Sequence, residues 1–583
     1  MVNNDREYLV GMIVGGISNE FSQEIIKGAI NAIPKGSNVK MVILPGELMR
    51  EGFMGDDVMH YHNLYNSTYN MGSLGDLDGL IIAMGSMGWQ YQRSELLDFL
   101  KQFDGIKTVL IASDFEGYTN VNYDNKSGIS ETIDCLVNMY GCTNIGMIGG
   151  YERNMDSERR RMIFKKCLEE NHLEFDENLY AASDMSVNSE EAARKLLDNN
   201  PELQAVFCVN DASAVGLYNV LEERGLRAGR DIYVFGFDNT HMAAEMTPTL
   251  SSIGAESVTL GQKAMEVVLA KINGQKVDSV NIPTRLYGRE SLRYDKYDYS
   301  LSDFSFMNSE LIDMMFEDCF YRYSNSYIND EDVNIKRLFS EIFGRMFTGL
   351  RRRYVGIEEF ETISRMIDIF FDNGALEYTD VWKFLTSVTR LQNGINKKQH
   401  LVENVYINRL FLRMKDDAIR SLSKMRIDEQ HEKIQFRSRL RQFLIKNMND
   451  NLSCKDSINE IMKALTIFNV NNAALYMFEK PMSDKEVLER KYPDHMLLKG
   501  VIREGEFYRI SEGKQNRKLQ DIYIQRVNKS SNVAFISFPL FYNDIFFGFL
   551  ICELTDDIYE KGDLIANITS LAINKAYNNA SAE

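Results

Sequence analysis

Short apolar runs alternate with amphipathic stretches throughout the first half of the chain. The stretch 22–33, for example, has apolar residues spaced three and four apart, as in a helix that buries one face. Near-continuous apolar strands separated by such helices indicate parallel sheets that are covered on both faces. The apolar runs predict strands at 8–14, 39–45, 78–85, 108–113, 144–150, 205–209 and 232–237.

The same alternation predicts how the first half is divided. About 285 residues exceed what one hydrophobic core comfortably holds, so two α/β lobes with a ligand cleft between them are expected. Polar residues follow two of the predicted strands: Asn210 and Asp211 come directly after 205–209, and Asp238 comes directly after 232–237. Residues at such strand ends either contact a ligand or cap the next helix. The pattern alone leaves both roles open.

The second half has a different pattern. A tyrosine- and aspartate-rich linker follows residue 294, and residues 306–446 then read as largely helical, with Thr379 and Asp380 predicted to cap a helix that begins at Val381. From about residue 452 a helix, a strand, two apolar strands joined around Asn543, and a closing helix predict an α+β unit with an antiparallel sheet.

One long amphipathic helix is predicted across residues 407–444. Its apolar positions recur at spacings of three and four, and a polar break interrupts them at 428–432. Such a helix either packs against its own chain or pairs with its copy in a dimer. We favour pairing, so a homodimer is expected.

Composition limits the classes of function. The net charge of −18 disfavours nonspecific binding to nucleic acid or to an anionic membrane. The chain has no apolar run long enough to span a membrane and no signal-peptide pattern, and its seven cysteines lack CxxC spacing, so a cytoplasmic location with reduced thiols is expected. His60 and His62 form only a weak metal signal. No metal or cofactor is predicted.

Four motifs of the first half resemble the effector-binding core of LacI-family regulators. They are DIYVFGFDNTHMAAEMTPTLSSIG (231–254), AVFCVNDASAVGLYNVLEERGL (205–226), VNYDNKSGI (121–129) and NIPTRLYGRESL (281–292). The resemblance covers residues 8–293. It implies a type I periplasmic-binding-protein fold, in which two α/β lobes are joined by crossover strands and close on a small polar molecule.

The resemblance also implies which residues face the ligand. Asp238 matches the family carboxylate, and Asn210 matches the family amide, which leaves Asp211 as the expected cap of the following helix. Either Arg159 or Arg160 matches the ligand-facing arginine, and aligning Phe164 with the family aromatic favours Arg160. The remaining expected positions are the first-lobe corner and the residue at the cleft or hinge, namely Ser18, Asn19, Phe21 and Asp124.

The chain departs from the family at its start. LacI-type regulators carry a helix-turn-helix before this fold, whereas the first strand here is predicted at about Tyr8. Direct DNA binding is therefore not expected. The segment 48–76 is also longer than a typical helix at that position.

The last unit is similar in its order of elements to a GAF domain. The expected domains are a LacI-like sensor at 8–293, a helical linker at 294–405, a signalling helix at 406–447 and a GAF-like domain at 448–579. This order resembles the input half of bacterial signalling proteins that end in an output domain such as a diguanylate cyclase.

No catalytic motif is found, so the chain itself is not expected to be an enzyme. The function expected is cytoplasmic sensing of a small polar molecule, favoured as a sugar, with the signal passing to an output domain or partner. The alternative is a transcription regulator that binds DNA through an unrecognised element or a partner. An enzyme built on this fold is the third interpretation.

Overall fold

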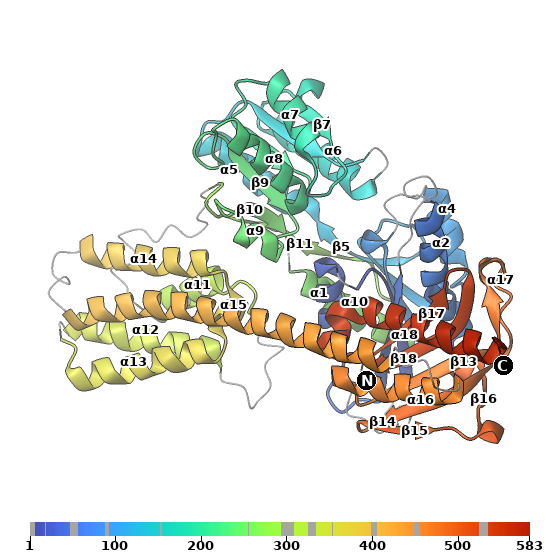
Figure 1. Cartoon of the computed structure of the whole chain (residues 1–583). Helices are drawn as coiled ribbons and strands as arrows, with labels where there is room; N and C mark the ends of the chain where they lie inside the picture. The colour runs from blue at the N-terminus through green and yellow to red at the C-terminus, as the bar shows by residue number, and fades with distance from the viewer. Residues whose placement is uncertain are drawn as a thin grey trace.

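The computed structural model of the chain contains four structural units, namely two interleaved lobes, a helical bundle and a C-terminal unit (Figure 1). It describes residues 6–17, 19–46, 56–87, 93–151, 154–254, 256–292, 308–323, 334–352, 354–397, 405–447, 454–523 and 534–582. No helix in these ranges is both long and apolar enough to cross a membrane.

Lobe 1 is built on a parallel sheet whose strands run in the order β11-β5-β4-β3-β1-β2. Its strands are β1 (Tyr8–Gly15), β2 (Val39–Gly46), β3 (Gly79–Ala83), β4 (Lys107–Ile111), β5 (Thr119–Asp124) and β11 (Val280–Pro283). Its helices are α1 (Glu20–Asn31), α2 (Asp56–Tyr65), α3 (Ser67–Leu74), α4 (Arg93–Lys101) and α10 (Ser257–Ile272).

Lobe 2 is built on a second sheet with the order β12-β10-β9-β8-β6-β7, parallel except where β12 joins β10. Its strands are β6 (Ile145–Gly149), β7 (Tyr180–Ala182), β8 (Ala205–Cys208), β9 (Tyr233–Phe237), β10 (Ser251–Gly254) and β12 (Arg285–Tyr287). Its helices are α5 (Asn125–Asn138), α6 (Met155–Glu170), α7 (Glu190–Asn199), α8 (Asp211–Glu223) and α9 (His241–Glu245).

The chain passes between the lobes at Asp124, again between β10 and α10, and again at Thr284. This arrangement confirms the predicted two-lobed α/β fold of the first half. The six cysteines whose side chains the structure describes are buried and free.

The third unit is a helical bundle. It contains α11 (Ser309–Cys319), α12 (Ile335–Arg352), α13 (Ile357–Asp372), α14 (Val381–Lys397) and the first part of α15 (Val405–Asn447). Buried aromatic rings fill its core, including Phe320, which contacts Phe339 and Phe370. Asp380 Oδ1 accepts a hydrogen bond from the Lys383 N–H at 2.7 Å, which confirms the predicted cap of α14.

The fourth unit is an antiparallel sheet with flanking helices. Its elements are α16 (Cys454–Leu465), β13 (Ala473–Ser483), α17 (Asp484–Leu488), β14 (His495–Arg503), β15 (Glu506–Arg509), β16 (Asn516–Lys518), β17 (Ala534–Tyr542), β18 (Ile545–Glu553) and α18 (Asp556–Ala582). β17 and β18 form the predicted hairpin, and Asn543 takes the left-handed conformation (φ 51°) that its turn requires. The likeness of this unit to a GAF domain stays a prediction.

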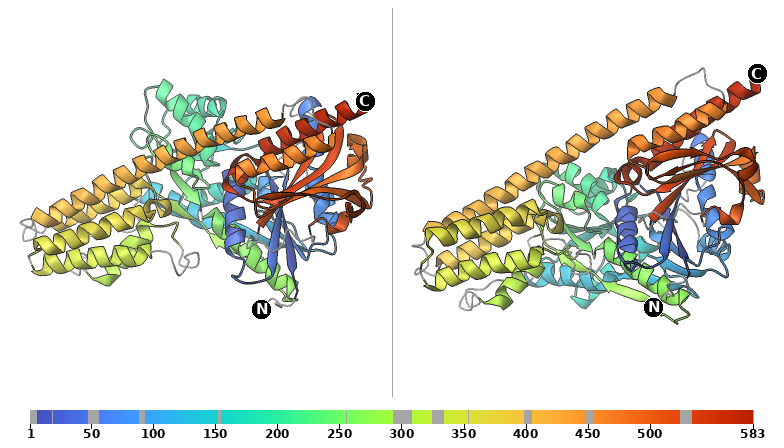
Figure 2. Two further views of the ribbon diagram at one scale, coloured as in Figure 1. Left: turned by 60° about the horizontal axis from the view of Figure 1, so that its bottom comes forward. Right: turned by 90° about the horizontal axis from the view of Figure 1, so that it is seen from below.

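The fourth unit joins lobe 1 in a way that the sequence pattern does not predict. β17 pairs in parallel with β2, so that the sheets of lobe 1 and the C-terminal unit form one sheet of 12 strands. The blue strands of lobe 1 and the red strands of the C-terminal unit lie side by side in Figures 1 and 2. The two units also share their hydrophobic clusters, so neither has a core of its own.

The unusual segment after β2 explains part of this junction. It forms α2 and α3, which lie against the C-terminal unit. The Tyr65 hydroxyl donates to Asp563, Tyr61 packs against Phe541, and Asn70 Nδ2 donates to the Tyr492 hydroxyl at 3.0 Å. The extra length of this segment therefore provides a docking surface.

Candidate ligand site between the lobes

An ion pair between a buried arginine and a half-buried carboxylate lies at the carboxyl ends of the strands in lobe 2. Arg160 is 6% exposed, and its Nη2 donates to Asp238 Oδ1 at 3.0 Å while its Nη1 donates to the Val209 carbonyl at 2.6 Å. Its guanidinium carbon also lies 3.6 Å from the centroid of the Phe237 ring. A charge-assisted bond and a cation–π contact together hold the guanidinium in one orientation. Arg160, rather than Arg159, is the arginine that meets the predicted carboxylate.

Asp238 is held in an unusual backbone conformation. Its φ of 98° is rarely adopted by a residue with a Cβ, and its N–H donates to the Ile253 carbonyl at 2.8 Å. Strain of this kind concentrates at functional sites. The side chain remains 33% exposed, and Oδ2 makes no hydrogen bond to the part of the chain that the structure describes. One carboxylate oxygen is therefore open to a ligand.

Asn210 caps the helix that follows β8. Its Oδ1 accepts from the Ser213 N–H at 2.9 Å, and its Nδ2 donates to the Met185 carbonyl at 2.8 Å. The expectation that Asp211 caps this helix is therefore wrong, because the residue one position earlier has the extended conformation that a cap needs. A ligand contact by Asn210 stays a prediction.

Asp211 instead braces the loop that carries Asp238. Its Oδ2 accepts from the Thr240 N–H at 2.8 Å, and its Oδ1 accepts from the Ser252 hydroxyl at 2.6 Å. Burial, with the nearby Asp238 carboxylate adding to it, raises the pKa of Asp211 to about 7. Asp211 is a positioning residue that links the ends of β8, β9 and β10.

The lobe 1 corner is formed by the start of α1. Asn19 Oδ1 accepts from the Phe21 N–H at 2.8 Å and caps the helix, and Phe21 packs partly buried against the main core. Ser18 lies outside the described residues. The contact between the lobes is made by a residue that was not predicted: Glu20 Oε1 accepts from the His241 N–H at 2.8 Å. The corners after β1 and β9 therefore meet directly.

Three glutamates gather beside this contact. Burial raises the pKa of Glu24 to about 7, and it also raises the pKa values of Glu20 and Glu256. The Arg322 guanidinium, from the end of the bundle segment 308–323, lowers all three pKa values. The sequence did contain one signal for this cluster, because Glu20 and Glu24 lie four residues apart at the start of a helix. No neighbouring residue indicated that Arg322 would join them.

The same cluster has the donor set of a metal site. Oxygens of Glu20 and Glu24 and a ring nitrogen of His241 lie within 4.8 Å of one another. However, Arg322 Nη1 lies 3.3 Å from His241 Nδ1, and burial, followed by Arg322, lowers the pKa of His241 to about 4. Arg322 already supplies a positive charge to these carboxylates, so the arrangement fits an internal ion cluster better than a metal site.

Replacing Arg322 by alanine is expected to destabilise the protein more at pH 8 than at pH 5. The pKa of Glu24 is raised from 4.5 to about 7 in the folded protein, so the folded state holds this proton more tightly than the unfolded state does. The resulting contribution to stability is fully present below pH 4.5 and is lost as the pH rises through 7. Arg322 offsets that loss only when the carboxylates are ionised. Urea unfolding at both pH values should show a difference of about 1 kcal/mol in the cost of Arg322→Ala. Arg322→Lys is the control that retains the charge, and an equal cost at both pH values would contradict this role.

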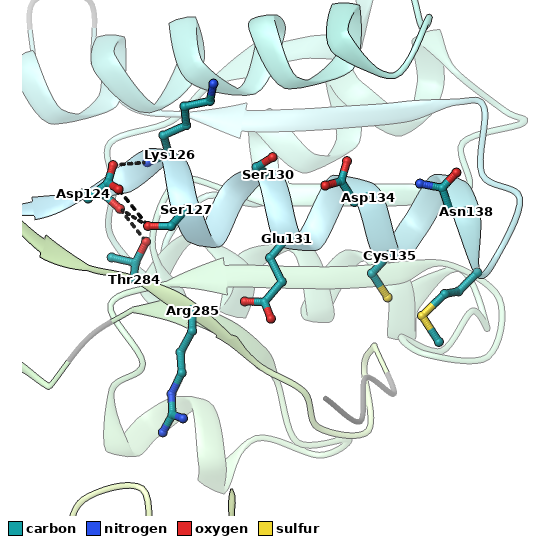
Figure 3. Close-up of a pocket in the computed structure, with 11 residues that line it drawn as sticks. Asp124, Lys126, Ser127, Ser130, Glu131, Asp134, Cys135, Asn138, Thr284 and Arg285 are labelled. Carbon is teal, nitrogen blue, oxygen red and sulfur yellow. Dashed lines mark hydrogen bonds between the residues drawn. The ribbon is translucent and has the colours of Figure 1, made fainter. Parts of the chain in front are cut away.

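Asp124 lies at the hinge, where β5 passes into lobe 2. Its Oδ1 accepts from the Lys126 N–H at 3.1 Å and caps α5, and its carbonyl accepts from the Thr284 hydroxyl at 2.7 Å. It also lines a hollow of about 830 Å³ that runs along α5 toward Asn138 (Figure 3). Among the described residues, no other predicted site residue lines this hollow.

A second ion pair, buried on both sides, joins lobe 2 to the helical bundle. Arg289, from the R-E-S motif, is 1% exposed, and its Nε lies 3.1 Å from Asp380 Oδ2 on the bundle. Arg289 Nη2 donates to Asn239 Oδ1 at 2.7 Å, one residue from Asp238. The Tyr321 hydroxyl also donates to Asp380 at 3.2 Å. Lobe 2 and the bundle are thus in contact one residue away from Asp238 of the candidate site.

Comparison with known proteins agrees with this geometry. Residues 139–292 match the family profile of the periplasmic binding protein-like domain. This stretch makes up most of lobe 2, with α10 and β11 of lobe 1. Together with lobe 1, it gives the first half of the chain the two-lobed α/β fold expected from the LacI-like motifs. The helical bundle and the C-terminal unit lie outside the matched residues.

Regulators of transcription are among the similar proteins. The HTH-type transcriptional regulator RegA of Clostridium saccharobutylicum is 24% identical over 299 residues, which are 50% of this chain and 83% of RegA. Catabolite control protein A of Priestia megaterium is 26% identical over 291 residues, 49% of this chain and 81% of that protein. The solved structure of the transcription regulator CcpA of Lactococcus lactis is 20% identical, covers 49% of this chain and 100% of its own, and has a TM-score of 0.40.

Proposed function

We propose that this chain is a cytoplasmic ligand-sensing regulatory protein whose effector binds between the lobes. The observation that carries the proposal is the Arg160–Asp238 pair at the strand ends, in which a buried guanidinium holds a half-buried carboxylate and leaves one of its oxygens open. A carboxylate and a guanidinium held in this way suit a ligand with several hydroxyl groups, so a sugar is the favoured class. Similar proteins include a ribose operon repressor of Escherichia coli, which is 23% identical over 271 residues.

The two contacts to the bundle suggest how a bound ligand acts. Asp238 is followed by Asn239, which accepts from Arg289, and Arg289 pairs with Asp380 at the start of α14. Arg322 reaches the glutamates where the lobes meet. A ligand that changes the angle between the two lobes must therefore shift or weaken the Arg289–Asp380 pair and the contacts of Arg322. We propose that this change passes through α15 to the GAF-like C-terminal unit and from there to an output domain or partner.

A thermal-shift screen of sugars and nucleosides tests the ligand site. We expect a stabilising compound whose effect is lost in Asp238→Ala and in Arg160→Ala, because each variant removes one member of the pair. Arg161→Ala is the matched control, since Arg161 lies on the same helix but pairs with Glu177 at the surface. A shift that persists unchanged in both site variants would show that the ligand binds elsewhere.

The second candidate function is regulation of transcription through a DNA-binding partner or an element that sequence motifs do not reveal. The names of RegA and of other relatives favour it. Titration of the purified chain with duplex DNA at low salt distinguishes the two, because electrostatic DNA binding is strongest there. Saturable binding that depends on the effector would favour this alternative.

A further inference from the structure

The middle of α15 stands free of the rest of the chain. Its first part packs in the helical bundle, and its last part packs on α16 and α18. Every residue from Ser423 to Gln435 is exposed. A helical span of this length without tertiary contacts is marginally stable in water, since most helical stability in proteins comes from packing.

An apolar stripe runs along the outer face of this helix. At 100° per residue its members fall within an arc of about 80°. They are Val405, Leu412, Ile419, Ile427, Ile434 and Ile445, exposed by 61, 59, 51, 55, 60 and 60%. The residues that α15 buries against its own chain lie on the opposite side, including Phe411, Ala418, Phe436 and Phe443. The stripe therefore continues past both packed ends and faces away from the molecule.

The charges on this stripe indicate what covers it. Arg409 and Arg437 share this face. Asp416 and Arg441 also lie on it, four residues after Leu412 and four residues before Ile445. Both are exposed, and neither forms an ion pair within the described part of the chain. In an antiparallel pair of identical helices, Leu412 comes opposite Ile445 and Asp416 opposite Arg441. Arg437 comes opposite Arg420, whose Nη1 lies 3.5 Å from Asp417 Oδ1 of its own helix. In a parallel pair each charge would face its own copy, which is unfavourable.

We propose that a second copy of this chain binds along the stripe, so that two α15 helices pair antiparallel about a twofold axis between Asp428 and Glu429. In this register Ser423 of one helix faces Ile434 of the other, and the small polar residue leaves room for the apolar one. The right view of Figure 2 shows α15 along an outer edge of the molecule. The inference does not depend on which molecule the interlobe site takes.

Sedimentation of the full chain over a range of concentrations tests the pairing. We expect a dimer, and we expect Ile427→Asp combined with Ile434→Asp to raise its dissociation constant about 100-fold or more. Met425→Asp is the matched control, because Met425 lies in the same span on the other side of the helix and is 40% exposed. A wild-type chain that remains monomeric at all concentrations, or a dimer indifferent to the double variant, would overturn the proposal.

Charge reversal tests the orientation. Asp416→Arg should weaken the dimer about tenfold, because it places two arginines together at two symmetry-related points, and adding Arg441→Asp should restore it. A parallel dimer would be unaffected by the single reversal. Ser423→Cys and Ile434→Cys give a second readout. Oxidation should link position 423 of one chain to position 434 of the other when both variants are present, and neither variant alone should link to its own copy. Self-linking of the single variants would overturn the antiparallel arrangement.

Discussion

Arg289→Ala is expected to lower the free energy of unfolding by roughly 3–5 kcal/mol. Arg289 is 1% exposed and Asp380 is 9% exposed, so removing the guanidinium leaves a buried carboxylate without its counter-charge. The variant also removes the donors to the Leu250 carbonyl, at 2.8 Å, and to Asn239, at 2.7 Å. Buried acceptors without donors add to the cost.

Urea unfolding measures this loss, and an exposed ion pair provides the control. Arg194 and Glu223 are exposed by 46 and 51%, so Arg194→Ala should cost at most about 1 kcal/mol. If Arg289 couples lobe 2 to the bundle, the variant should also unfold in two urea transitions, one for the bundle and one for the lobes. A cost for Arg289→Ala no larger than that of the control would contradict the ion pair seen here.

Ile536→Asp is expected to destabilise lobe 1 and the C-terminal unit together, by roughly 4–6 kcal/mol. Ile536 is fully buried on β17, and its partner across the junction is Ile43 on β2. The variant loses apolar burial and places a carboxyl group inside the shared core. Because the two units form one sheet and share their hydrophobic clusters, neither is expected to remain folded when the junction opens.

Hydrogen exchange resolved by peptide measures this coupling. Protection should fall in β1–β4 and in β13–β18 alike, while the helical bundle, which has its own core, should keep most of its protection. Tyr542→Asp is the control, since Tyr542 ends the same strand and is 37% exposed. Loss of protection confined to β17 and β18 would show that the C-terminal unit folds independently of lobe 1.

The sequence predicted those features that depend on neighbouring residues. Apolar runs alternating with amphipathic helices are local patterns, and both sheets follow from them. The cap at Asp380 was also local, because a capping side chain bonds three residues ahead. Arg160 and Asp238 were assigned to one site by resemblance, and in the structure Arg160 Nη2 lies 3.0 Å from Asp238 Oδ1. Their contact with a ligand stays a prediction.

Other features of the site depend on segments far apart in the chain. Asn210 and Asp211 are adjacent polar residues, and only the fold of the corner shows that the first caps α8 while the second braces Thr240 and Ser252. Arg322 reaches the glutamates of α1 from a different unit. Apolar spacing could not tell the two faces of α15 apart, because both sides of the helix carry apolar residues at helical spacing.

By itself the sequence determined the order of the units, the two-lobed α/β plan of the first half and the polar strand ends where a ligand is expected. Only the tertiary structure decided that β17 continues the sheet of lobe 1, that Arg289 and Arg322 join the lobes to the bundle, and which face of α15 stays open. The physical reason is the range of the interactions. Periodicity and capping act within a few residues, whereas strand pairing and buried ion pairs form only where packing brings distant segments together.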